Sequence, residues 1–112
     1  MNALPQHISL ASGRWFALSF LEQMGNIGSE VHRALEWQER DQGIFNRAID
    51  NALELLDLTI RDTRWRGRLK EVSRVREFLC DVVFGQGQYA TLEDFDEYFL
   101  SFAIATWSLQ NK

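Results

Sequence analysis

Residues 91–109 read TLEDFDEYFLSFAIATWSL, and this stretch decides the predicted fold. Side chains at three- and four-residue spacing share one face of a helix. They are Leu92, Phe95, Phe99, Phe102, Thr106 and Leu109. Thr91 and Asp94 approximate a capping box at the helix start, and the charged residues are confined to 93–97. Beyond them the helix is apolar nearly all round, so it must be covered on more than one side.

A second apolar set lies round the side of this helix and predicts a homodimer. The chain has more apolar surface than four helices of this length can hide. The predicted interface consists of Leu100, Ile104, Trp107, Gly25 and Gly28. A competing interpretation is that an N-terminal arm, residues 1–12, covers the same face through Ile8 and Leu10.

Three further helices precede this one. Apolar periodicity predicts them from about 12–15 to 40, from 44 to 60 and from 69 to 84, with Gly85 ending the last. The periodicity fails at 61–68, which we interpret as a loop or frayed end. On the second helix, Asp57 is placed to pair with Arg61 one turn later. Short turns imply antiparallel neighbours, so we predict an all-α protein: an antiparallel up-and-down four-helix bundle forming one domain, 1–112.

Composition and the ends of the chain restrict where the protein acts. A hydrophobic fraction of 46% with 25% charged residues is typical of a globular protein. No run approaches the roughly 18 apolar residues of a membrane span. Residues 1–6 lack the basic and apolar regions of a signal peptide. The single Cys80 fits a reducing compartment or a buried thiol. We therefore predict a cytoplasmic protein without a membrane contact.

Two glycines inside the first predicted helix need an explanation. Glycine in a helix interior costs about 1 kcal/mol relative to alanine, and Gly25 and Gly28 lie one turn apart. One explanation is the close approach of another helix, or a kink. The other is a backbone surface kept open for a ligand or partner.

Seven of the twelve basic side chains lie within residues 61–76, although the net charge of −4 argues against a general nucleic-acid binder. Arginines can bind the phosphates of a nucleic acid, and Trp65 beside them can stack on a base. They can also dock an acidic face of a protein, or form a solvated turn paired with nearby acids. The candidate binding residues in this segment are Arg64, Trp65, Arg66, Arg68 and Arg74.

The stretch SRVREFLCDVVFG, residues 73–85, carries a family resemblance. At Arg76, Glu77 and Phe84 it resembles the motif of small four-helix HEPN domains, in which an Arg-acid pair precedes a His and an aromatic-rich turn. Asp81 stands where that His would be, so the resemblance implies a non-catalytic member that accompanies a nucleotidyltransferase, often as a dimer. We add Arg76, Glu77 and Asp81 to the candidate binding residues. Alternatively, these are ordinary charges on a helix face.

No residue set predicts catalysis, a cofactor or a metal site. His7 and His32 are joined by neither a cysteine nor a Glu-x-x-His pair, and no glycine-rich phosphate loop is present. The sequence therefore favours a non-enzymatic interaction or accessory protein acting as a homodimer. The alternative is a nucleic-acid-related protein, a weak binder or nuclease that uses residues 61–76.

Overall fold

The computed structural model describes residues 13–87 and 90–110, and these residues are mostly helical. After a helical turn at 13–15 come α2 (Phe20–Trp37), α3 (Gln42–Arg61), the short 3-10 helix η1 (Thr63–Arg68), α4 (Leu69–Phe84) and α5 (Leu92–Gln110). The prediction of an all-α chain is confirmed for this part. The predicted arm at 1–12, with Ile8 and Leu10, lies outside the described residues.

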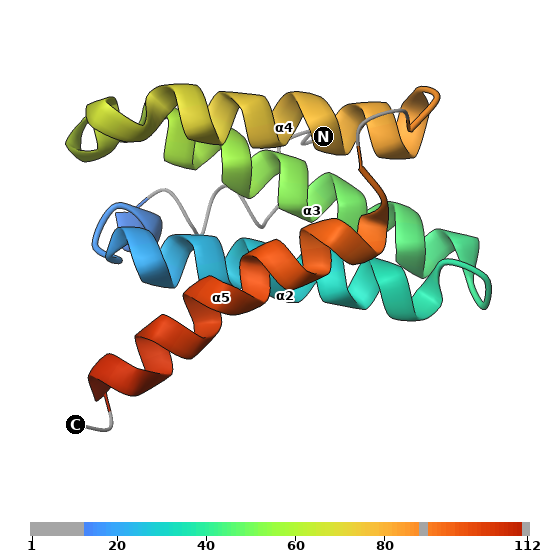
Figure 1. Cartoon of the computed structure of the whole chain (residues 1–112), viewed down its shortest axis with the longest axis horizontal. Helices are drawn as coiled ribbons and strands as arrows, with labels where there is room; N and C mark the ends of the chain where they lie inside the picture. The colour runs from blue at the N-terminus through green and yellow to red at the C-terminus, as the bar shows by residue number, and fades with distance from the viewer. Residues whose placement is uncertain (1–12, 88–89, 111–112) are drawn as a thin grey trace.

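Helix α2 packs against both α3 and α5, and α4 packs mainly against α3 (Figure 1). The colour gradient shows that successive long helices run in opposite directions, and that α5 crosses α2 obliquely. The core between them is built from the inward stripes of all four long helices. Its fully buried members include Met24, Ile27, Val31, Ile49, Leu56, Val72, Leu79 and Phe99.

The first long helix begins later than the sequence predicted, at Phe20. Ser19 has an extended backbone, and its hydroxyl accepts from the Glu22 amide while the Glu22 carboxylate accepts from the Ser19 amide. This capping box ends the preceding turn and starts α2. The chain can therefore fold back so that Trp15 is buried.

The connections predicted between the first three helices, at 41–43 and 61–68, also differ from the prediction. Asp41 caps α3, so Gln42 and Gly43 belong to its first turn. The segment predicted as a loop, 61–68, is largely η1. The predicted pairing of Asp57 with Arg61 is wrong, because Asp57 lies 2.7 Å from Nε of Arg76 in α4. This ion pair joins two helices instead of two turns of one helix.

Helix α5 confirms the predicted core stripe in its first half only. The capping box of Thr91 and Asp94 forms, and Leu92, Phe95, Phe99 and Phe102 are buried. Thr106 is half-buried, and Leu109 is 60% exposed. The ring of Phe102 contacts Phe20, the first residue of α2, and the turns that follow cross the start of α2, where Thr106 and Gln110 line a hollow together with Glu22 (Figure 1).

Candidate functional site

The basic segment is organised around the buried carboxylate of Asp62, which caps η1. Arg64 donates to it from Nε at 3.0 Å and from Nη2 at 2.7 Å, and the Arg64 amide adds a third bond. The hydrogen bonds from Arg64 lower the pKa of Asp62 to about 2 in spite of its burial. The positive charge of Arg64 and the negative charge of Asp62 are therefore paired with each other within the chain.

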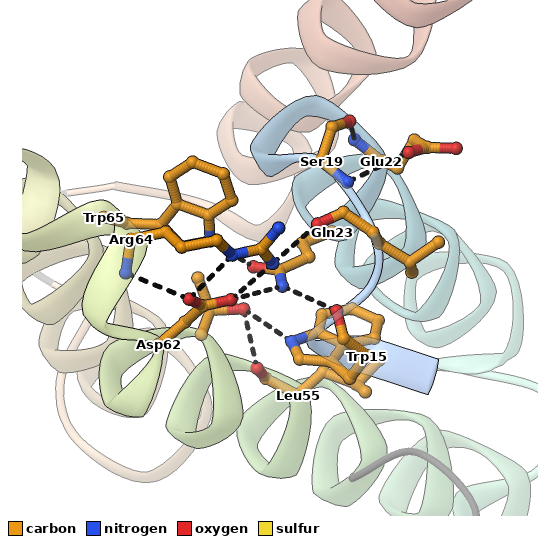
Figure 2. Close-up of polar contacts among 10 residues, drawn as sticks. Trp15, Ser19, Glu22, Gln23, Leu55, Asp62, Arg64 and Trp65 are labelled. Carbon is orange, nitrogen blue, oxygen red and sulfur yellow. Dashed lines mark hydrogen bonds and ion pairs between the residues drawn. The ribbon is translucent and has the colours of Figure 1, made fainter. Parts of the chain in front are cut away.

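Gln23 extends this pair into a network that joins four parts of the fold (Figure 2). Its Nε2 donates to Asp62 at 3.0 Å and to the Trp15 carbonyl at 2.8 Å, and its Oε1 accepts from the Trp65 indole at 2.9 Å. The Trp15 indole in turn donates to Thr59 in α3. The buried amide thus has partners for both of its ends, as a polar group in a core requires.

Trp65 is held within this network and is not presented as a free stacking surface. Its ring packs edge-on against Phe20, with centroids 5.5 Å apart, and the Arg64 guanidinium lies 4.4 Å from its centroid. Arg64 also donates to the Leu18 carbonyl. The structure therefore brings Arg64 and Trp65 together as predicted, but each is committed to contacts inside the chain.

Arg68 forms a second set of contacts at the same end of the molecule. Its Nε and Nη2 both donate to Glu71, and its guanidinium lies 4.1 Å from the centroid of the Phe20 ring. The other oxygen of Glu71 accepts from the Tyr98 hydroxyl at 2.6 Å. Of the predicted residues in η1, Arg66 alone is exposed with no ion pair to another described residue.

The α4 residues of the predicted site point to different places. Arg76 pairs with Asp57 against α3, and its Nη1 lies 3.7 Å from the Cys80 sulfur. Glu77 is exposed, and the Asp81 carbonyl accepts the amides of Gly85 and Gly87 at the end of α4. Arg76 is therefore paired with an acid of α3, whereas Glu77 faces solvent. Arg74 instead lines a cleft between α4 and α5.

The predicted interface residues of α5 lie together on its outer face. Leu100, Ile104 and Trp107 are 54%, 56% and 65% exposed. Beside them, α2 and α5 enclose a groove of about 330 Å³, with Gly25, Ser29 and Ala103 among its lining. His32 and Asp96 also line this groove and contact each other at 3.1 Å.

The two glycines of α2 have different roles. A Cβ on Gly28 would lie 2.5 Å from Cβ of Phe99, so the close approach of another helix explains this glycine. Gly28 is buried beneath α5 of the same chain. The prediction that Gly28 belongs to the dimer interface is therefore wrong. A Cβ on Gly25 would meet only the Ala103 Cα, at 3.9 Å, so Gly25 keeps an open face in the groove.

Comparisons with protein-family models, curated proteins and solved structures found no match to this chain. The geometry alone therefore carries the functional argument. Among residues 13–87 and 90–110 there is no group of three His, Cys, Asp or Glu side chains placed to hold a metal ion. No helix in the same part of the chain has the length and apolarity needed to cross a membrane.

Sequence reasoning missed the residues that organise this end of the molecule. Gln23 and Asp62 are 39 positions apart in the sequence, and Glu71 and Tyr98 are 27 positions apart, so no local sequence pattern predicts either contact. The one available signal was a glutamine within the inward stripe of α2. A buried amide requires polar partners, and Gln23 could have been used to search for them.

Proposed function

We propose that the chain is a cytoplasmic, non-enzymatic interaction protein, built as an antiparallel up-and-down four-helix bundle, that acts as a homodimer. The observation that carries the proposal is the outer face of α5. Leu100, Ile104 and Trp107 lie exposed there, beside the groove that α5 forms with α2. Contiguous apolar surface of this kind marks an interaction site, and tryptophan is enriched at interface centres.

Charge favours a second copy of the chain as the partner. From residue 98 to residue 110, α5 has no charged side chain, although the chain has a net charge of −4. Two such faces can pack together without electrostatic repulsion. An acidic or basic partner protein would have no opposite charge to pair with on this part of the helix. The ridge of Leu100 and Ile104 also adjoins a groove lined by Gly25, Ser29 and Ala103. A two-fold axis would place the ridge of each copy in the groove of the other.

Light scattering at micromolar concentration tests this proposal. We expect a mass of about twice the 13.1 kDa of the chain. Ile104→Glu should lower the mass toward that of one chain, because a dimer would bury an unpaired carboxylate. Leu69→Glu is the matched control, since Leu69 is 44% exposed at the start of α4 and should leave the dimer intact. A native mass near 13.1 kDa would contradict the proposal.

We further propose that the dimer is an accessory subunit of the HEPN-like type that accompanies a nucleotidyltransferase. Two features support the non-catalytic part: Asp81 occupies the position of the expected His, and the Arg76 guanidinium pairs with Asp57. An RNA-cleavage assay of the native protein should show no activity. Cleavage that disappears in Arg76→Ala would contradict the proposal.

Nucleic-acid binding through residues 61–76 is the less favoured function, because Arg64, Arg68 and Arg76 are already paired with acids. Titration with labelled RNA at two salt concentrations distinguishes the two functions. We expect weak binding at either concentration. Strong binding that falls steeply as salt rises would instead indicate phosphate contacts by this segment.

A further inference from the structure

A second cleft, of about 360 Å³, lies between α4 and α5, away from the proposed dimer face. Its walls are apolar and include two aromatic rings from opposite helices: Phe78 on α4 and Phe95 on α5. Val75 and Ala90 contribute aliphatic surface, and Tyr98 adds a third ring. The volume falls in the range of small-molecule sites, and facing helices of a bundle commonly build such sites.

One end of the cleft is polar and already neutralised. The Tyr98 hydroxyl donates to Glu71, which also accepts two bonds from Arg68. Burial, together with the bond to Glu71, raises the pKa of Tyr98 above its usual range. The phenol therefore stays protonated, and the charge of Glu71 is balanced by Arg68 within the chain.

Arg74 is the basic residue of the cleft lining. Its side chain is exposed at the lining, and no acid among the described residues lies within ion-pair distance of it. Asp94 lies on the opposite wall, where its carboxylate accepts from the Thr91 amide. An anion placed against α4 would meet the Arg74 guanidinium beside the rings.

We infer that the cleft between α4 and α5 binds a small aromatic carboxylate. The rings of Phe78, Phe95 and Tyr98 contact its apolar body, and Arg74 pairs with its carboxylate. An edge-to-face arrangement with these rings favours a planar aromatic body over a flexible aliphatic chain. A guanidinium suits the carboxylate because it can donate two parallel bonds to it.

Two probes of the same shape test the inference: naphthalene-2-carboxylate and its uncharged analogue naphthalene-2-carboxamide. NMR titration of the native protein should place the shift changes at Val75, Phe78 and Phe95. We expect the carboxylate to bind roughly two to five times more tightly than the carboxamide, because an exposed ion pair with Arg74 contributes only modestly.

Arg74→Gln should abolish this preference while leaving carboxamide binding unchanged. Arg33→Gln removes an exposed arginine of α2 that does not line the cleft, and it should keep the preference. Val75→Trp should fill the cleft and weaken both probes more than tenfold, with circular dichroism verifying that the variant is helical. Equal binding of the two probes to the native protein would overturn the inference. So would a preference that survives Arg74→Gln, or shift changes confined to Ile104 and Trp107.

Discussion

Asp62 is a buried acid whose hydrogen-bond partners come from separate elements of the fold. Its carboxylate is 4% exposed and accepts hydrogen bonds from both Arg64 and Gln23. A buried charge of this kind is stable only while every partner is present. The contacts of Asp62 therefore link the end of α3 to α2 and to the turn that buries Trp15.

Asp62→Asn should lower the free energy of unfolding by about 2–4 kcal/mol at neutral pH, because Arg64 would lose its ionic partner. Urea denaturation measures the loss. Asp50→Asn is the matched control, since Asp50 is exposed on α3 and should change stability by less than about 0.5 kcal/mol. Equal stability of the two variants would contradict the role given to Asp62.

The same carboxylate predicts a pH dependence. The pKa of Asp62 is lowered from 3.8 to about 2 in the folded chain. Its stabilisation is therefore complete above about pH 4 and is lost as the pH falls toward 2, because the unfolded chain binds the proton first. The difference in unfolding free energy between the native protein and Asp62→Asn should shrink across that window. A difference that stays constant from pH 6 to pH 2 would exclude this origin.

Gly28 and Gly25 offer a second comparison at the residue scale. Gly28→Ala forces a methyl group to within 2.5 Å of Phe99 Cβ and should cost about 1–3 kcal/mol. Gly25→Ala meets no such contact, so the helix propensity of alanine should leave the chain equally stable or more stable. Thermal denaturation distinguishes the pair. Equal losses from both substitutions would contradict the close approach at Gly28.

At the scale of the helices, the sequence predicted those helix ends that are set by residues close together in the chain. The start of α5 follows from the Thr91–Asp94 capping box, and the bounds of α4 follow from its apolar stripe and Gly85. The start of α2 carries the same kind of local signal, a capping box of Ser19 and Glu22, which the prediction of one helix from about 12–15 to 40 overlooked.

The candidate sites were predicted less completely than the helices, because many of their contacts join residues that are far apart in the sequence. The outer face of α5 is local in sequence, so periodicity found it. The partners of Arg64, Arg68 and Arg76 are acids that either lie on other helices or adjoin the arginine, and spacing alone does not choose between these. Asp57 illustrates the difficulty: Arg61 is one turn away on the same helix, yet Asp57 pairs with Arg76.

Phe99→Ala tests the core assigned to α5. Phe99 is 1% exposed and packs over Gly28, so truncation should cost about 3–5 kcal/mol, most of the stability of a small domain. Phe84→Ala removes the same ring from a position that is 67% exposed and should cost under about 1 kcal/mol. Denaturation followed by circular dichroism gives both values. A melting temperature that is unchanged in Phe99→Ala would place this ring outside the core.

At the scale of the whole molecule, the basic segment and the second half of α5 lie at the same end, where the Arg68 guanidinium is 6.0 Å from the centroid of the Phe102 ring. The second half of α5 has no charged side chain, and Leu100, Ile104 and Trp107 on its outer face are exposed. In Figure 1 the last turns of α5 lie below the start of α2, away from α3 and α4. We propose that a second copy of the chain covers the apolar outer face of this helix.

We propose that the outer face of α5 packs against the same face of a second copy, and an isotope-filtered NOE experiment detects such contacts. Isotope-labelled and unlabelled protein are mixed, so that only contacts between different copies give signals. We predict contacts from the Ile104 methyl groups of one copy to Trp107, Leu100 or Ala103 of the other. Intermolecular contacts confined to α4, or no intermolecular contacts although the native protein has the mass of a dimer, would contradict an interface on α5.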